Sequence, residues 1–491
     1  MQEVHQISEI LQKWPIQKQI GSADITVSNL CFDSRKVNET SLFFAIPGIK
    51  TDGHQYLEAV VKMGCRAVVV EQIPHLISEG VTYIQVKDTR ECLGYVSGHW
   101  YDHPSQKLTL IGVTGTNGKT TLVTLLHQLF SSIGFKTGLI STIENIIGQD
   151  LLPSSYTTPD ILTINQLLSQ MVDFGCQYAF MEVSSHALVQ KRTYGLHFAG
   201  AVFTNITRDH LDYHITFNDY IKAKKLLFDY LPPSSFALVN ADDKHSKVMV
   251  QNTKASVITY ALHAVSDYKG RILSNSLTGM ELDLNGASVH IPLFGTFNAS
   301  NLLAVYATAL QLYGDKEEIL THLSMLRAPK GRLDTCMSPN RAVMGIVDYA
   351  HTPDALEKLL EVLLPLREKK GKLILVVGCG GDRDKGKRPL MGKIAVKWSD
   401  LTIFTADNPR TEEINDILNE MEGDLTATEL DHVIRIEDRK MAIKTAVKLA
   451  VSGDVIVVAG KGHENYQEIK GERFHFDDLE ELNNNFNQLK H

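Results

Sequence analysis

Residues 108–121 read LTLIGVTGTNGKTT, and this stretch decides the fold of the middle of the chain. Its first residues are mostly apolar and predict a buried strand that ends near Thr114. Behind the turn, leucines recur at the spacing of one helix face, at Leu122, Leu125, Leu126 and Leu129. A strand, a glycine-rich loop and a helix in this order are typical of a phosphate-binding unit, because loop amides and a helix N-terminus both attract anions.

The loop itself carries the residue types that a nucleoside triphosphate and its metal ion require. Lys119 can reach the β- and γ-phosphates, and Thr120 can offer its hydroxyl to Mg²⁺. The strict G-x-x-x-x-G-K-[ST] pattern fails at one place, because Val113 stands where its first glycine is expected. A glycine-rich turn with a solvated lysine is the alternative interpretation. The predicted ATP-binding residues of the loop are Gly115, Thr116, Asn117, Gly118, Lys119, Thr120 and Thr121.

Strand candidates alternate with helical stretches along the whole chain, which predicts an α/β protein. A chain of 491 residues has room for roughly three domains of about 150 residues. We expect a small N-terminal α/β domain at 1–104, a central P-loop ATPase-like domain with a parallel sheet at 105–330, and a C-terminal Rossmann-like doubly wound domain at 331–491. The main strand candidates in the last two are YAFMEV (178–183), GAVFTNI (200–206), KLILVVG (372–378), LTIFTA (401–406) and DVIVVAG (454–460).

Composition excludes several classes of protein. The formal net charge of -8 argues against a nucleic-acid partner, because such affinity rests on many Lys and Arg residues. The six cysteines are scattered without a C-x-x-C pair, so neither a zinc ribbon nor a disulfide framework is indicated. The N-terminus lacks the pattern of a signal peptide, and no apolar run approaches the ~20 residues that span a bilayer. We expect a cytoplasmic monomer without a membrane partner.

Several separated stretches occur in the order found in the Mur ligase superfamily, whose phosphate loop reads G-x-x-G-T-N-G-K-T. The chain resembles this superfamily over nearly its whole length and, within it, the MurE branch, including the meso-diaminopimelate type. Besides the phosphate loop, the stretches that carry the resemblance are YTTP (156–159), MEVSSH (181–186), DHLDYH (209–214), AK (223–224), FNASN (297–301), DYAHTPD (348–354) and DNPR (407–410).

The resemblance implies an ATP-dependent ligase of peptidoglycan biosynthesis. It would add meso-2,6-diaminopimelate to the D-glutamate of UDP-N-acetylmuramoyl-L-alanyl-D-glutamate through an acyl phosphate, with ATP as co-substrate and Mg²⁺ as cofactor. The N-terminal domain would bind the UDP-sugar, the central domain ATP, and the C-terminal domain the amino acid. The alternatives are a MurE-type L-lysine ligase, a folylpolyglutamate synthetase-like ligase and, from a different class, a P-loop nucleotide-binding switch.

By this resemblance the catalytic residues are Lys119, Glu182, His210 and Lys224, and the Mg²⁺ ligands are Thr120, Glu182, His210 and a carbamylated Lys224. The residues themselves leave alternatives open. Glu182 ends an apolar strand, where an ionised carboxylate needs a cation, which could be Mg²⁺ or a salt-bridge partner. His210 and His214 are four residues apart, a spacing that also suits zinc or packing. Lys224 could be a solvated helical lysine.

The resemblance also assigns the substrate contacts. Residues matched to the UDP-muramoyl dipeptide are Ser34, Thr157, Thr158, Ser184, Gln190 and Arg192, with the stretch 48–54 as a uridine loop. Tyr156 departs from the family's pattern, in which some members have Asn. Residues matched to ATP outside the loop are Asn298, Asn301, Arg332 and Asp348. The two asparagines could equally cap a helix.

The amino-acid site is matched to Arg383, Asp407, Asn408, Pro409, Arg410, Gly460 and Glu464. Arg410 decides the specificity, because a guanidinium binds the second carboxylate of diaminopimelate with two parallel hydrogen bonds, whereas lysine would leave it unpaired. Glu464 would contact an ammonium group. The alternative interpretation of DNPR is a turn that starts a helix from Thr411.

Overall fold

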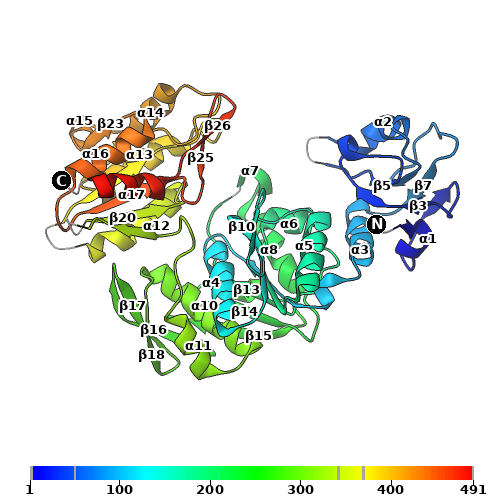
Figure 1. The fold of residues 1–491 in the computed structure, drawn as a ribbon, viewed down its shortest axis with the longest axis horizontal. Helices are drawn as coiled ribbons and strands as arrows, with labels where there is room; N and C mark the ends of the chain where they lie inside the picture. Colours follow the sequence, from blue (N-terminus) through cyan, green and yellow to red (C-terminus); the bar gives the residue numbers. More distant parts are fainter. Residues whose placement is uncertain (1–3, 49–50, 210, 340–342, 368–370, 489–491) are drawn as a thin grey trace. The chain divides into compact units, whose positions relative to one another are not determined.

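The computed structural model describes residues 4–48, 51–209, 211–339, 343–367 and 371–488. The chain divides into two compact units, of which the first holds Met1–Lys269 and Ala307–Asp315 and the second holds Gly270–Tyr306 and Lys316–His491. Figure 1 labels many of the helices and strands of both units. The domain boundaries expected after residues 104 and 330 stay a prediction.

The N-terminal part of the first unit is a five-stranded sheet in the order β2-β7-β6-β5-β4. Its inner strands are buried except at Gln85 of β7, and alternate residues face two hydrophobic clusters, one on each side of the sheet. The elements are β1 (His5–Gln6), α1 (Ile7–Ile10), β2 (Lys18–Ile20), β3 (Thr26–Val27), β4 (Asn29–Cys31), β5 (Ser41–Phe44), α2 (Leu57–Lys62), β6 (Ala67–Val70), β7 (Thr82–Gln85) and α3 (Thr89–Trp100).

The rest of the first unit is built on the strands β11-β10-β9-β12-β8-β13-β14-β15, in this order, of an eleven-stranded sheet that continues through β16, β17 and β18. Strand β8 pairs in parallel with β12 on one side and β13 on the other, so the loops after these three strands leave the same edge. The strands are β8 (Thr109–Thr114), β9 (Thr137–Ile140), β10 (Glu144–Ile147), β11 (Asp150–Pro153), β12 (Tyr178–Glu182), β13 (Gly200–Phe203), β14 (Phe236–Asn240) and β15 (Ser256–Ala261).

Helices follow these strands, as an α/β fold requires. Helix α4 begins directly after Gly118. The side chain of Asp160 caps the N-terminus of α5, and the side chain of Thr216 caps that of α8. The helices are α4 (Lys119–Ile133), α5 (Ile161–Phe174), α6 (Ser185–Val189), α7 (Leu211–His214), α8 (Phe217–Asp229) and α9 (Ser246–Met249). Strand β16 (Tyr268–Ser276) pairs with β15 through its first two residues.

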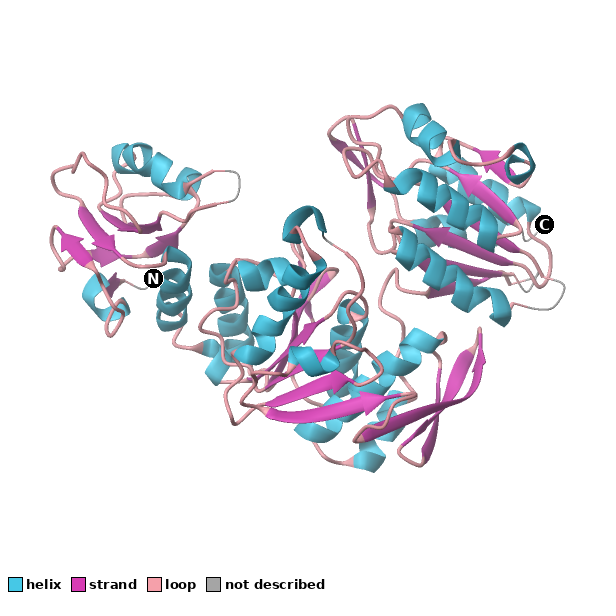
Figure 2. Cartoon of the chain, turned by 180° about the vertical axis from the view of Figure 1, so that it is seen from behind, coloured by secondary structure: helices cyan, strands magenta, loops and turns pink. Residues whose placement is uncertain are grey.

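The second unit contains a six-stranded sheet in the order β19-β20-β24-β21-β22-β23, with helices on both faces (Figure 2). Helices α12 (Pro353–Leu363), α13 (Lys387–Trp398) and α14 (Ile414–Glu422) pack on one face of the sheet. Helices α16 (Arg439–Leu449) and α17 (Asp478–Gln488) pack on the other face, against the alternate residues of the same strands. All strands but β19 run parallel. The strands are β19 (Asp334–Met337), β20 (Met344–Asp348), β21 (Leu373–Val377), β22 (Leu401–Phe404), β23 (Val433–Arg435) and β24 (Val455–Ala459).

Smaller elements complete the second unit. Strands β16, β17 and β18 form an antiparallel meander, and β25 and β26 form a hairpin. The remaining elements are β17 (Gly279–Leu284), β18 (Ala287–Ile291), α10 (Thr296–Leu312), α11 (Lys316–Leu323), α15 (Ala427–Leu430), β25 (Tyr466–Ile469) and β26 (Glu472–His475). The residues of α10 from Ala307 onward belong to the first unit.

The predicted α/β fold class is confirmed, and each quoted strand candidate is a strand. The strand, loop and helix around residues 108–133 are β8, the glycine-rich loop and α4. The alternative interpretation of DNPR as a turn that starts a helix from Thr411 was wrong. The next helix, α14, begins at Ile414, and Arg410 forms a β-bridge with Ile469. Among the helices of the described part of the chain, none combines the length and apolar character needed to cross a bilayer.

Candidate active site

The phosphate loop follows β8 at the centre of its sheet. Gly115 approaches β13 so closely that a Cβ atom on it would lie 1.9 Å from Thr204 Oγ1, so only glycine fits. Gly118, the residue before α4, has a φ of 86°, in the left-handed region that favours glycine. Both glycines that flank the tip of the loop are therefore required by the backbone, and the loop amides precede the N-terminus of a long helix.

Side chains from the end of β13 and from α8 hold the loop in shape. Thr204 donates a hydrogen bond to the Asn117 carbonyl at 2.6 Å, and the Asn117 amide donates to Asn205 Oδ1 at 3.0 Å. The hydroxyls of Thr116 and Tyr220 are 3.1 Å apart. Sequence reasoning did not assign a role to Thr204, Asn205 or Tyr220. The available signal was the polar pair that directly follows the buried strand GAVF.

Two lysine ammonium groups converge on one carbonyl of this loop. Lys119 donates to the Gly115 oxygen at 2.9 Å and to the Thr116 oxygen at 3.0 Å. Lys224, which lies 109 residues after Gly115 in the chain, donates to the same Gly115 oxygen at 2.7 Å. The structure thus brings together, at one loop carbonyl, the two lysines that the family resemblance assigned to catalysis.

Lys224 is buried rather than solvated. Its side chain is on α8, only 1% of the residue is exposed, and its ammonium lies 4.6 Å from the centre of the Tyr220 ring. Burial, together with the charge of Lys119, holds the pKa of Lys224 well below its ordinary value. The alternative of a solvated helical lysine is therefore wrong.

Glu182 lies beside the phosphate loop. It ends β12 and is in register with Val113 of β8, two residues before Gly115. The residue is 0% exposed, and its Oε1 accepts a hydrogen bond from the Thr142 amide at 2.7 Å. Its Oε2 is buried and has no hydrogen-bond partner among the residues that the structure describes. A salt bridge, the other reading of this residue, is not formed by any described side chain.

Three of the predicted dipeptide contacts, Thr157, Thr158 and Ser184, lie close to Glu182. The Thr158 hydroxyl donates to the Glu182 carbonyl at 2.8 Å and accepts from the Ser184 amide at 3.0 Å. The Thr157 hydroxyl accepts from that of Thr142 at 3.0 Å. Residues assigned from sequence to the metal and to the dipeptide are thus neighbours at one edge of the sheet.

The described side chains supply only part of a coordination shell for Mg²⁺. The buried Oε2 of Glu182 is an oxygen that a hard cation can satisfy, and the buried Thr120 is the second residue of α4. Within the described ranges, no three His, Cys, Asp or Glu side chains are grouped so as to hold a metal. His210 lies outside the described residues. His214 is buried and shares a hydrogen bond with Ser185 Oγ at 2.9 Å, as a packed residue does.

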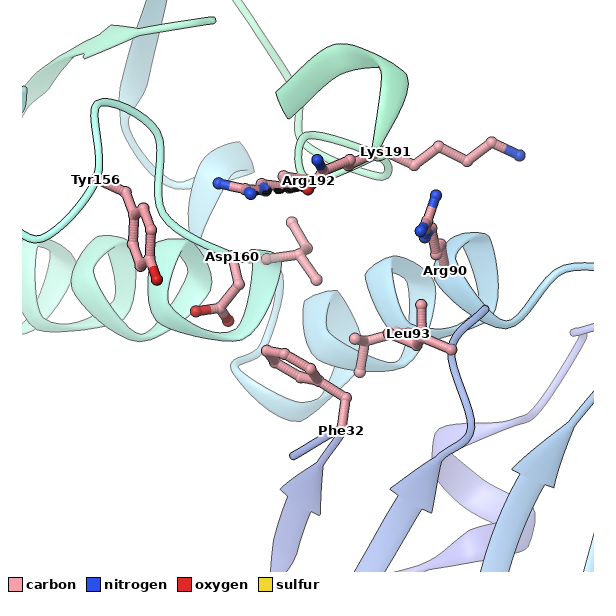
Figure 3. A pocket seen from close by; sticks show the side chains of 10 residues that line it. Phe32, Arg90, Leu93, Tyr156, Asp160, Lys191 and Arg192 are labelled. Carbon is pink, nitrogen blue, oxygen red and sulfur yellow. Dashed lines mark hydrogen bonds between the residues drawn. The ribbon is translucent and has the colours of Figure 1, made fainter. Parts of the chain in front are cut away.

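A pocket of about 240 Å³ lies between the N-terminal sheet and the central sheet of the first unit (Figure 3). Its lining residues are Phe32, Ile46, Arg90, Leu93, Tyr156, Asp160, Ile161, Gln190, Lys191 and Arg192. Arg192 donates to Gln190 Oε1 and to the Thr158 carbonyl, which are neutral acceptors. Among the described residues no carboxylate forms a salt bridge with this half-buried guanidinium, which suits an anionic ligand.

Other predicted dipeptide contacts lie around this pocket. Gln190 donates to the Tyr213 hydroxyl at 3.2 Å, and the Tyr156 ring lies 5.6 Å from the Arg192 guanidinium carbon. Lys191, which sequence reasoning missed, pairs with Asp88 and Glu91 at the start of α3. Ser34 begins a short 3₁₀ turn and does not line the pocket. Residues 49 and 50 of the predicted uridine loop lie outside the described residues.

The remaining predicted ATP contacts belong to the second unit. Asn298 and Asn301 are buried inside α10 and bond to each other at 3.3 Å, so they do not cap the helix. Asp348 ends β20 and accepts from the amides of Leu333 and Ala350. Burial raises the pKa of Asp348, and Arg332 opposes this rise. The Nε of Arg332 is buried without a partner among the described residues, so the group retains a donor for a ligand.

The predicted amino-acid site lies at the carboxyl ends of β22 and β24. Gly460 has a φ of 114°, and a Cβ atom on it would lie 2.6 Å from Asp407 Oδ2. Asn408 donates to Glu464 Oε2 at 2.7 Å. Burial raises the pKa of Glu464. The fully buried Lys461, which sequence reasoning missed, contacts both Asn408 and Glu464; its signal was a basic residue directly after the buried strand VIVVAG.

Arg410 is held in an unusual backbone conformation. Its φ is 53°, in the left-handed region, and the hairpin strand β25 fixes it by accepting from the Arg410 amide at 3.0 Å. The guanidinium donates to the Gly381 carbonyl at 2.7 Å. Arg383 is exposed and directly follows Asp382, in the loop that leaves β21. The site residues Arg410 and Arg383 therefore lie near each other, both within reach of Gly380.

Comparison with known proteins gives consistent matches along the chain. Models of the Mur ligase family match residues 26–101 (Mur ligase family, catalytic domain), 113–309 (Mur ligase middle domain) and 331–462 (Mur ligase, glutamate ligase domain). A protein of Cytophaga hutchinsonii named UDP-N-acetylmuramoyl-L-alanyl-D-glutamate--2,6-diaminopimelate ligase is 52% identical, covering 96% of this chain and 97% of its own. The protein of that name from Phocaeicola vulgatus is 52% identical, with coverages of 98% and 99%. A solved structure of such a ligase has a TM-score of 0.71 and 33% identity, and covers 100% of both chains.

Proposed function

Because the chain belongs to the Mur ligase family, we propose that it joins meso-2,6-diaminopimelate to the D-glutamate of UDP-N-acetylmuramoyl-L-alanyl-D-glutamate at the expense of ATP. The relatives that are half identical over nearly the whole chain carry this activity in their names. The product is a precursor of peptidoglycan.

One observation carries the proposal: the residues that we assign to the triphosphate, to a cation and to the acceptor are neighbours where β8 and β12 end. The phosphate loop with Lys119 supplies the site for a triphosphate. The buried, unpartnered oxygen of Glu182 supplies a place for a cation. The Thr158 hydroxyl donates to the Glu182 carbonyl, and the Thr158 carbonyl accepts from Arg192, which lines the adjacent pocket. A nucleotide switch would need the first two features but no acceptor pocket beside them.

The reaction needs an activated carboxylate, because hydroxide is a poor leaving group. A carboxylate oxygen of the D-glutamate side chain attacks the γ-phosphorus, the bond to the β–γ bridging oxygen breaks, and ADP leaves. The amine of diaminopimelate then attacks the acyl carbon, phosphate leaves with that carboxylate oxygen, and the nitrogen releases a proton. Lys119 lies where it can neutralise the transferring group, and the loop amides orient it.

The metal contacts would come from Thr120, Glu182, His210 and Lys224. Bound Mg²⁺ supplies a charge that draws the phosphate oxygens and the carboxylate together. For Lys224 to serve as an anionic ligand, its nitrogen must bond to the carbon of CO₂ and lose a proton, which gives a carbamate. The resemblance to the family and the burial of Lys224 beside the loop support this modification.

The amino acid would occupy the loops after β22 and β24 in the second unit. Asp407, Asn408, Gly460 and Glu464 lie together there, and Arg410 presents its guanidinium near Gly380 and Gly381. An arginine suits the distal carboxylate of diaminopimelate and disfavours lysine. Pro409 and Arg383 complete the set taken from the family, and Asn298, Asn301, Arg332 and Asp348 remain assigned to the nucleotide.

ATP and a UDP-linked acceptor point to the cytoplasm as the place of action, and we expect a monomer. An omission assay tests the function. Purified protein is given ATP, Mg²⁺, the UDP-linked dipeptide and meso-diaminopimelate, and phosphate release is followed. We expect release only with all components and an equal amount of amide product. Release that needs neither acceptor nor amino acid would instead support a nucleotide switch.

A further inference from the structure

Lys461 is a fully buried lysine at the amino-acid site for which neither the family resemblance nor the reaction assigns a role. It follows Gly460 directly after β24, and 0% of the residue is exposed. Its ammonium donates to Asn408 Oδ1 at 3.0 Å and lies 3.3 Å from Glu464 Oε2. The ring of Tyr466 is 5.4 Å away. A buried ammonium is costly unless it is paired, so these contacts determine where the charge can lie.

The two carboxylate oxygens of Glu464 differ in their contacts. Oε2 receives the ammonium of Lys461 and the amide NH₂ of Asn408, the latter at 2.7 Å. No hydrogen bond within the described part of the chain uses Oε1. A carboxylate held through one oxygen is fixed in orientation, and its other oxygen retains its capacity to accept.

Lys461 also fixes the side-chain amide of Asn408. Asn408 Oδ1 accepts from Lys461 and from the Glu468 amide, the latter at 2.9 Å. Because a lysine has only donors, the amide oxygen must face Lys461, and the NH₂ group must then face Glu464. One cation thereby sets the orientation of both polar side chains.

We infer that Lys461 is a positioning residue for the diamino acid, which holds Glu464 through Oε2 and presents Oε1 to an ammonium group of that substrate. The inference rests on the proposed function and deepens it, because Lys461 acts through Glu464 and need not touch the substrate. The competing explanation is that Lys461 only stabilises the fold of the loop after β24.

The surroundings of Glu464 give a sign for the pH dependence. Burial raises the pKa of Glu464, Asp407 raises it too, and Lys461 with its neighbour Asn408 lowers it. The other titratable or charged groups that interact with Glu464 are Tyr349, Tyr466 and Arg439. Removing the charge of Lys461 leaves burial and Asp407 less opposed, so the pKa of Glu464 must rise. Only the ionised carboxylate pairs with an ammonium, so the acid limb of kcat/KM for diaminopimelate must move to higher pH.

The test compares Lys461→Met with wild type in the full-length protein. Met retains the apolar length of the side chain without its charge. We expect KM for meso-diaminopimelate to rise about 10- to 100-fold, as for loss of a charge-assisted contact. KM for ATP and for the UDP-linked dipeptide should change less than about twofold, and the acid limb should move up in pH. Lys440→Met, at an exposed lysine of the same unit, is the matched control.

A double-mutant cycle with Glu464→Gln separates positioning from folding. If Lys461 acts through Glu464, Lys461→Met should change KM by less than about threefold in the Glu464→Gln background. Lys461→Gln, which retains a donor for Asn408 but no charge, should give the same shift of the acid limb and covers the case in which the Met variant does not fold. Equal losses for all three substrates, additive effects in the cycle or an unmoved acid limb would overturn the inference. A wild-type protein that fails to ligate diaminopimelate would reject the proposed function itself and the inference with it.

Discussion

Replacing Glu182 with glutamine should separate the stability of the protein from its activity. Glu182→Gln retains the shape of the side chain and its Oε1, which accepts from the Thr142 amide at 2.7 Å. It replaces Oε2, a buried oxygen without a hydrogen-bond partner among the described residues, with an uncharged NH₂ group. The substitution therefore removes the buried oxygen that we assign to a cation.

The magnitude follows from the cost of that oxygen. A buried polar group without its partner costs about 1–3 kcal/mol, and more when it is charged. The NH₂ group is also unpaired, so only part of this cost is recovered, and we expect the metal-free variant to be about 1–2 kcal/mol more stable. In a cooperative unit of some 150–250 residues this corresponds to a rise in Tm of roughly 2–8 °C.

Ligand binding should reverse the order of stability. A ligand at 100 times its Kd stabilises a protein by about 2.7 kcal/mol, so Mg²⁺ with ATP should raise the Tm of wild type. The variant should gain much less when Mg²⁺ is added to ATP. Loss of several kcal/mol of charge stabilisation should also lower kcat by about 10²-fold or more.

Thermal unfolding in EDTA and in Mg²⁺ with ATP, followed by calorimetry, measures both effects. Glu58→Gln, on the exposed face of α2, is the control and should change stability by less than about 0.5 kcal/mol. A Glu182→Gln variant that is less stable than wild type in EDTA, yet retains the full Mg²⁺-dependent rise in Tm, would refute the assignment of Glu182 to a cation.

Three further substitutions test the site. Lys119→Ala should abolish ligation with little loss of Tm, because Lys119 lies where the loop meets α4 and donates to two carbonyls of that loop; unchanged turnover at saturating ATP would remove the phosphate-loop assignment. Lys224→Ala should be nearly inactive and regain part of its activity with a small added carboxylate; a fully active variant, or an intact mass without a carbamate in the working enzyme, would reject the modification. Arg410→Ala should lose most of the preference for meso-diaminopimelate over L-lysine, a preference of up to about 10⁴-fold, measured as the ratio of kcat/KM values; comparable kcat/KM for both amino acids in wild type would show that the specificity is wrong.

The parts of the molecule that the sequence predicted are those set by local pattern. The strand before Thr114, the helix after Gly118 and the glycines between them follow from short-range periodicity and backbone geometry. The strand ends that carry Glu182 and Asp407 follow from the same pattern, because parallel strands gather their carboxyl ends at one edge.

The parts that could not be predicted depend on contacts between distant segments. Lys224 looks like one of several lysines on a helix, and only the fold brings it to the Gly115 carbonyl. The left-handed backbone of Arg410 is imposed by pairing with β25, which no local preference indicates. Lys461 has no signal beyond its place after a strand, since its partner Asn408 comes from a different strand end.

Transfer of an isotope label tests the central claim most directly. The UDP-linked dipeptide is prepared with ¹⁸O in both oxygens of the D-glutamate side-chain carboxylate and is ligated with ATP and meso-diaminopimelate. Activation as an acyl phosphate predicts that each released phosphate carries one ¹⁸O atom and that one ADP forms per amide bond. Unlabelled phosphate, or phosphate released without amide formation, would contradict it.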